Sequence, residues 1–68
     1  MAADYNIGDR ITFNDSDHGV KVVLAGTVNG ASIVDSTAIY VPVHVHGGNK
    51  NIYVNEKNIT LVQRKVEP

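Results

Sequence analysis

The sequence contains no cysteine and no tryptophan, and leucine occurs only twice. Without cysteine the chain forms neither disulfides nor thiolate zinc sites, which are two common ways of stabilising a small domain. The 68 residues make one domain, and a domain of this size buries only about 60% of its unfolded surface. We therefore expect its stability to come from a compact core, from self-association, or from both.

The chain also lacks an excess of positive charge, because six basic and seven acidic side chains give a formal net charge of −1. A dedicated nucleic-acid-binding protein shows a basic patch or stripe instead. Residues 1–10 have neither the basic region nor the apolar region of a secretory signal peptide. No apolar run approaches the roughly 20 residues of a transmembrane helix. We therefore expect a cytoplasmic protein without a membrane partner.

Valine and isoleucine dominate the apolar residues, and glycine, asparagine, aspartate and serine interrupt them every several residues. β-Branched residues favour strands, and no window has a sustained helical period. The sequence therefore predicts an all-β protein. The predicted strands cover residues 8–13, 20–28, 38–45, 50–54 and 59–62. The predicted connections are loops at 14–19 and 29–37, with 32–34 as a candidate short strand, and a helical turn at 55–58.

Alternation within these strands predicts which side chains form the core. The predicted core residues are Ile11, Phe13, Val22, Leu24, Val28, Ile39, Val41, Val43, Val45, Ile52, Val54, Ile59 and Leu61. Val20 and Gly26 share the inward face of their strand, where a glycine permits a sharp bend. Val23 and Ala25 fall on the outward face, and they are either ordinary exposed surface or a subunit contact.

The stretch YVPVHVHGGNKNIYV, residues 40–54, predicts a hairpin that turns at two glycines. A two-residue turn pairs residue 44 with 51 and residue 42 with 53, and it sets apolar side chains opposite each other on the inner face. Proline has no N–H, so its amide position must face away from a neighbouring strand. The outward face of this hairpin carries Tyr40, Pro42, His44, His46, Asn49, Asn51 and Tyr53.

The order GDRITF, AGTV, a long strand joined to NIYV, a turn and ITLV resembles the SH3-like small barrels of the KOW and Tudor type. The resemblance covers most of residues 7–62. It implies a five-stranded SH3-like barrel with a short helical turn before the last strand. Residues 1–62 then form the domain and residues 63–68 a flexible C-terminal tail. Because this fold serves unrelated functions, the function depends on a site.

Residues 50–53, Lys-Asn-Ile-Tyr, are also similar to the pore-lining Val-Gln-Ile-Tyr stretch of the plasmid-type (type II) dihydrofolate reductases. Those enzymes are SH3-like barrels that assemble as tetramers around a central pore. Only Ile52 and Tyr53 agree with the stretch, and Lys21 is a loose counterpart of the pore lysine. The tryptophan that the family uses at its interfaces is missing. This resemblance implies an alternative function, an enzyme whose site forms only in an oligomer.

Two histidines, His44 and His46, are close enough on one strand to share a metal ion. A third ligand from the segment Asp15 to His18 requires the first loop to fold over the hairpin. The same loop offers carboxylates for acid–base chemistry, but an exposed loop supplies neither the geometry nor the burial that such a pair needs. We therefore expect no metal, no cofactor and no catalytic residue.

Nucleic-acid binding is a second alternative, because Tyr40 and Tyr53 are available to stack bases. The basic residues that follow the hairpin could face one way, although the seven acids oppose this role. These basic residues are Lys50, Lys57, Arg64 and Lys65. The sequence has no nucleophile motif and no phosphate-binding loop, since neither Lys-Ser/Thr nor a helix follows the two glycines. That absence favours a binding module over an enzyme.

The outward face of the hairpin has the composition of a recognition surface. Tyrosine and proline supply apolar contact area, while histidine and asparagine supply donors and acceptors. We expect a small non-enzymatic binding module of bacterial or phage type that recognises a protein partner with this face and forms a homo-oligomer. The other interpretation, that the tyrosines merely cover the rim of the barrel, stays open.

Overall fold

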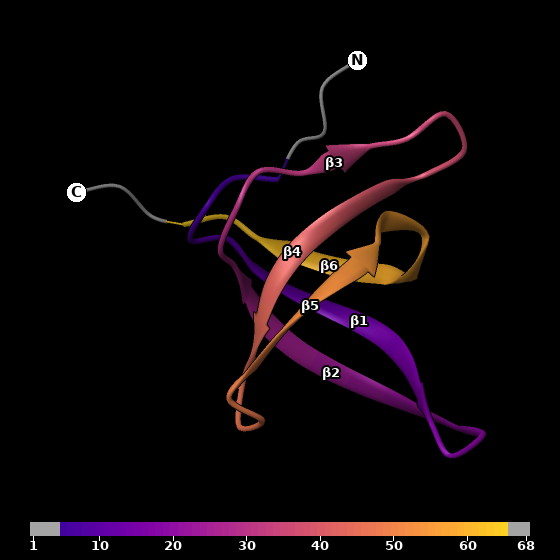
Figure 1. Cartoon of the computed structure of the whole chain (residues 1–68). Coiled ribbons are helices and arrows are strands. Elements are labelled where there is room, and N and C mark those ends of the chain that lie inside the picture. Colours follow the sequence, from indigo (N-terminus) through magenta and orange to yellow (C-terminus); the bar gives the residue numbers. More distant parts are fainter. Residues whose placement is uncertain (1–4, 66–68) are drawn as a thin grey trace.

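The computed structural model describes residues 5–65, and within them six strands form one antiparallel sheet (Figure 1). The elements are β1 (Arg10–Asp17), β2 (Val20–Val28), β3 (Ile33–Val34), β4 (Ile39–Val45), β5 (Lys50–Asn55), the 3-10 helix η1 (Glu56–Asn58) and β6 (Ile59–Gln63). The all-β prediction and the helical turn before the last strand are confirmed. The number of strands is six rather than five, because β3 pairs with β4. The described residues contain no helix that is long and apolar enough to span a membrane.

The sheet runs in the order β3-β4-β2-β1-β6, and β5 pairs with the remaining edge of β4. β4 thus pairs with three strands, since its first residues pair with β3, its last residues pair with β2 and its other edge pairs with β5. Pro42 lies between these two pairings, where its missing N–H costs no ladder bond. Its carbonyl oxygen accepts the N–H of Asn29 at 3.1 Å. The chain therefore crosses from β2 to β3 directly beside Pro42.

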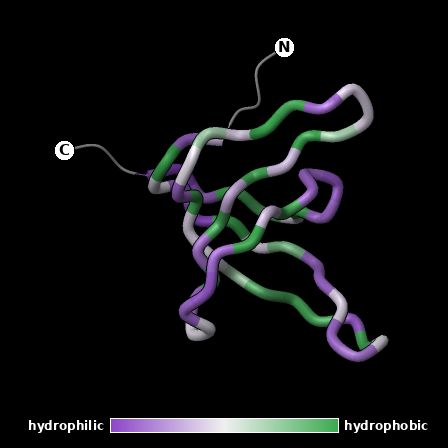
Figure 2. The backbone as a smooth tube through the Cα atoms, in the orientation of Figure 1, coloured by the Kyte–Doolittle hydropathy of each residue, from purple (hydrophilic) through white to green (hydrophobic). Residues whose placement is uncertain are grey.

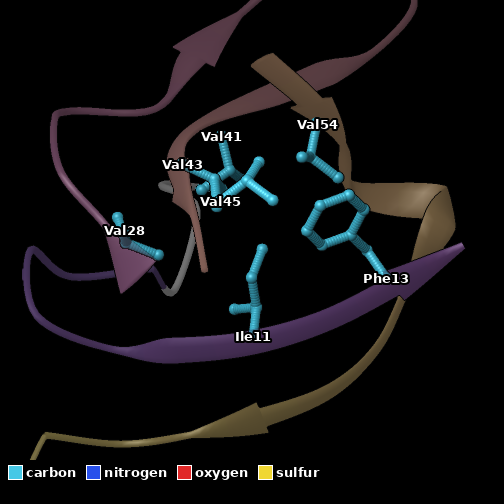
Figure 3. Packing of buried hydrophobic residues seen from close by; sticks show 7 residues of the cluster. All are labelled: Ile11, Phe13, Val28, Val41, Val43, Val45 and Val54. Carbon is cyan, nitrogen blue, oxygen red and sulfur yellow. The ribbon is translucent and has the colours of Figure 1, made fainter. Parts of the chain in front are cut away.

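The core consists of seven buried apolar side chains from β1, β2, β4 and β5 (Figure 3). They are Ile11, Phe13, Val28, Val41, Val43, Val45 and Val54. All seven belong to the predicted core, and Figure 2 shows hydrophobic stretches along the strands and hydrophilic ones at the turns. Burial of each such side chain stabilises the fold by roughly 1.5–3 kcal/mol, which is how a chain without disulfides holds together.

The first hairpin is longer than the sequence predicts. Residues 14–17 continue β1 and pair with residues 20–23 of β2, so the turn consists of His18 and Gly19 alone. Neither β6 nor β4 extends along this outer half, which projects from the rest of the sheet (Figure 1). The prediction that Val20 points into the core is wrong, because it lies on this projecting half and is 63% exposed.

The prediction that Leu61 belongs to the core is also wrong. A β-bulge interrupts the pairing of β1 with β6: Thr12 lies opposite Leu61, but Phe13 lies opposite Ile59. Thr60 is the extra residue, and its hydroxyl donates to the carbonyl oxygen of Thr12 at 3.2 Å. Because a bulge breaks the two-residue alternation, Thr60 and Leu61 are both exposed while Ile59 and Val62 pack against the core.

Asp9 is a buried charged residue just before β1, with 2% of its surface exposed. Its carboxylate accepts the backbone N–H groups of Lys65 (2.9 Å) and Asn6 (3.1 Å) and the guanidinium of Arg64 (2.9 Å). These bonds, the one from the Lys65 N–H foremost, lower the pKa of the carboxyl group, while burial opposes them. Asp9 therefore ties the two ends of the described chain together.

The contacts of Asp9 involve residues of the predicted C-terminal tail, 63–68. Gln63 completes β6, and Arg64 and Lys65 bond to Asp9. These three residues are therefore held by the domain instead of forming part of a flexible tail. The remainder of the expected tail, 66–68, lies outside the described residues.

Candidate functional site

The hairpin of β4 and β5 has the register that the sequence predicts. Val43 lies opposite Ile52, His44 opposite Asn51, and Pro42 opposite Tyr53. Residues 46–49 form the turn, with Gly47 and Asn49 both at positive φ. This register puts four polar or aromatic side chains and one proline on one face, here called the hairpin face: Tyr40, Pro42, His44, Asn51 and Tyr53.

A hollow of about 350 Å³, here called the first hollow, lies between the hairpin face and the segment that joins β2 to β3. Its lining includes Asn29, Gly30, Ile33, Pro42, Asn51 and Tyr53. Gly30 fits closely there, because a Cβ atom at this position would lie 3.1 Å from the Pro42 ring. The segment and the hairpin therefore pack tightly at this point.

The apolar side of the first hollow is open to solvent. Tyr53 is 65% exposed and Ile33 is 48% exposed. Ile33 lies opposite Tyr40 across the β3–β4 pairing, so it shares the outward side of the sheet with the hairpin face. Exposed aromatic and branched side chains beside a hollow offer contact area that a partner can bury.

The polar side of the first hollow is a chain of three hydrogen-bonded side chains. The Nδ2 group of Asn29 donates to Oδ1 of Asn51 at 2.9 Å. The same oxygen lies 3.0 Å from Nδ1 of His44 and accepts a hydrogen bond in the tautomer with the proton on Nδ1. These bonds fix the positions of both amides without help from the core. Every residue that lines the first hollow is uncharged.

His46 and Asn49, which sequence reasoning placed on the same face, lie in the turn beyond the ladder. The Nε2 atom of His46 is 2.7 Å from the hydroxyl oxygen of Thr27. His46 also lines a second hollow of about 320 Å³, between the first hairpin and this turn, over Val22 and Leu24. The structure thus separates the predicted binding residues into a group of five and two turn residues.

Ile52 and Tyr53 line the first hollow, but Lys21 and His18, two other candidates for the alternative functions, do not. Lys21 lines a third hollow, together with Asn14 and Val23, and so does not meet Tyr53 within one chain. His18 lies 3.5 Å from the carboxylate of the neighbouring Asp17, on the exposed tip of the first hairpin. Within residues 5–65, no group of three or more histidine or acidic side chains is placed to hold a metal ion.

Sequence reasoning missed Asn29 and Ile33, which supply one wall of the first hollow. Both lie in or beside a segment that reads as a loop, and only the pairing of β4 with β2 and β3 brings them to the hairpin face. The available signal was the Asn29-Gly30 pair, since glycine marks a close approach of two backbones. Asp9 was also missed, because a single acid before a strand does not reveal its burial.

Comparisons with known proteins identify no relative: neither a family model, nor a curated protein, nor a solved structure matches this chain.

Proposed function

We propose that the chain folds as an SH3-like small barrel. Leaving the two-residue β3 aside, the strand order is β6-β1-β2-β4-β5, with a 3-10 helix directly before the last strand. Along the chain, these elements follow the motif order on which the resemblance to KOW and Tudor barrels rests. Gly26 supports the proposal, because a buried glycine in β2 permits the bend that a small barrel needs.

We propose further that this domain is a non-enzymatic binding module that recognises a protein partner with the hairpin face. The observation that carries the proposal is the first hollow, which joins an exposed Tyr53 and Ile33 to the prearranged amides of Asn29 and Asn51. Protein interfaces combine apolar anchors with polar groups in this way, and tyrosine is frequent among their strongest contacts. A purely solubilising surface would carry lysine and glutamate instead.

The test is a selection from a random dodecapeptide display library on the immobilised full-length protein. We expect enriched peptides that bind the wild type and lose at least tenfold in affinity for Tyr53→Ala. The matched control is Val34→Ala, since Val34 is 64% exposed and does not line the first hollow. A library without enriched peptides, or peptides indifferent to Tyr53→Ala, would contradict the proposal.

The stability of Tyr53→Ala separates binding from folding. An outward ring contributes little to the core, so its removal should lower the free energy of unfolding by less than about 1 kcal/mol. A loss of roughly 3 kcal/mol or more, as in truncation of a core residue, would mean that Tyr53 serves the fold. Urea denaturation of both proteins gives this number.

A further inference from the structure

We infer that the partner at the first hollow is an extended polypeptide segment with free main-chain N–H and C=O groups, held by the amides of Asn29 and Asn51. The inference rests on the proposed function and specifies the chemistry of its partner. It follows from the hydrogen-bonding groups that the two amides leave unused, from the apolar side of the first hollow and from its lack of charge.

The two amides leave three N–H donors and one acceptor oxygen unused. Oδ1 of Asn51 accepts two bonds, which leaves its Nδ2 group as a donor, and Asn29 donates one bond, which leaves its Oδ1 as an acceptor. Within residues 5–65 no hydrogen bond occupies these two remaining groups. If both amide groups are rotated by 180°, Asn51 has the unused acceptor oxygen and Asn29 has an unused donor group, so both kinds of group are still present. A peptide unit carries one N–H and one C=O, so it can donate to Oδ1 of Asn29 and accept from Nδ2 of Asn51.

The apolar side of the first hollow adds room for a side chain next to the bonded peptide unit. Ile33 and Tyr53 are exposed there, and the ring of Pro42 in β4 lies close to Gly30 of the segment that joins β2 to β3. In an extended chain, alternate side chains point to the same side, so one apolar residue enters while its neighbours face away. The site thus fits a β-like segment with an apolar residue at its centre.

Other kinds of partner fit less well. A helix uses its main-chain groups internally, and a proline-rich segment lacks the N–H group that Asn29 or Asn51 needs. A nucleic acid is bound largely through its phosphates, which require nearby cations. The lining of the first hollow carries no charged residue. An uncharged, extended peptide supplies both a donor and an acceptor for the two amides and an apolar side chain for the first hollow.

The first experiment titrates the full-length protein with acetyl-Thr-Val-Thr-Leu-Thr-Val-Thr-amide and follows the side-chain amide signals of Asn29 and Asn51 by NMR. We expect both signals to shift. Copies of the peptide with one N-methylated amide each should include at least one that binds about five- to tenfold more weakly, the effect of one lost hydrogen bond. Absence of binding, or equal affinity for all copies, would overturn the inference.

The second experiment changes the protein. Asn51→Asp keeps an oxygen for Asn29 and His44 but replaces the free donor with an acceptor, so the same peptide should bind about tenfold more weakly. Asn14→Asp introduces the same charge at an exposed position outside the first hollow and should bind like the wild type. Equal binding by Asn51→Asp would overturn the inference.

Two further probes test the competing partners. Tighter binding of acetyl-hexaproline-amide or of a thymidine dodecamer than of the extended peptide would overturn the inference. If display-selected peptides depend on Tyr53 while N-methylation and Asn51→Asp have no effect, the proposed function stands and only the inference fails.

Discussion

At the scale of single residues, the clearest structural role belongs to Asp9. It is buried, its carboxylate accepts bonds from three residues, and those bonds connect the beginning of the domain with its end. A buried carboxylate is stable only with such partners, because desolvation otherwise favours the neutral acid. These hydrogen bonds favour the ionised carboxylate and therefore lower the pKa of Asp9.

The pH dependence of stability follows from the direction of that shift. The pKa of Asp9 in the folded protein lies below the usual value of 3.8, so the folded state favours the ionised form. The stabilisation is fully present above about pH 4 and is lost as the pH falls through the folded pKa. Asp9→Asn should therefore lower the free energy of unfolding at pH 7 by roughly 2 kcal/mol and reduce its decline toward pH 2.

Urea denaturation at a series of pH values measures both effects. The control is Asp17→Asn, an exposed acid at the tip of the first hairpin, which should change neither stability nor its pH profile appreciably. If Asp9→Asn declines as steeply as the wild type between pH 4 and pH 2, Asp9 is not the titrating group.

Gly26 is a second residue with a specific structural requirement. It is buried where β2 meets β4, and a Cβ atom there would collide with the side chain of Val43 and lie 2.6 Å from the carbonyl oxygen of His44. Because one neighbour is backbone, the collision cannot be relieved by a rotamer change. Gly26→Ala should lower the free energy of unfolding by roughly 1–3 kcal/mol, whereas Gly48→Ala, with no contact closer than 3.7 Å, should change it little. Equal melting temperatures for the two variants would contradict this packing.

At the scale of elements, the β4–β5 hairpin was predictable and the first hairpin was not. The apolar alternation of residues 39–45 and the Gly47-Gly48 pair specify one register together, since a slip by one residue would expose the core face. Residues 14–17 are polar on both faces, so nothing in the sequence distinguishes a projecting strand from a loop. The bulge at Thr60 is likewise invisible, because it depends on the pairing of β6 with β1.

This difference gives a test at the element scale. Val43 and Val20 both alternate inward in the sequence, but Val43 is fully buried and Val20 is largely exposed on the projecting half of its hairpin. Val43→Asn buries an amide without partners and should unfold so small a domain or nearly so. Val20→Asn should stay within about 0.5 kcal/mol of the wild type. Similar losses in thermal denaturation of the two variants would mean that the first hairpin packs differently.

At the scale of the whole molecule, we propose that the protein self-associates. Val23 on β2 is 66% exposed and Leu61 on β6 is 53% exposed. β1 lies between these two strands, with its Thr12 opposite Leu61. Both lie on the outward side of the sheet, away from the core and from the first hollow. A small domain without disulfides gains stability when a second copy covers such side chains.

Sedimentation equilibrium up to millimolar concentration tests this proposal. We expect a mass above that of the monomer, and a return toward the monomer in Val23→Glu. Val34→Glu places the same charge at an equally exposed position on β3 and should leave the association unchanged. A strict monomer would exclude the proposal and, with it, an oligomeric enzyme of the type II reductase kind, whereas a stable tetramer would favour that enzyme.

The central proposal is that a partner binds to the hairpin face, so the location of the bound partner tests it. The most direct measurement is a backbone-amide NMR map of the full-length protein with its strongest display-selected peptide. We expect the largest shifts in the segment around Asn29 to Ile33 and on the hairpin face, with the second hollow near Val22 unaffected. Shifts concentrated at the second hollow, or around Val23 and Leu61, would contradict the assignment of the hairpin face as the binding site.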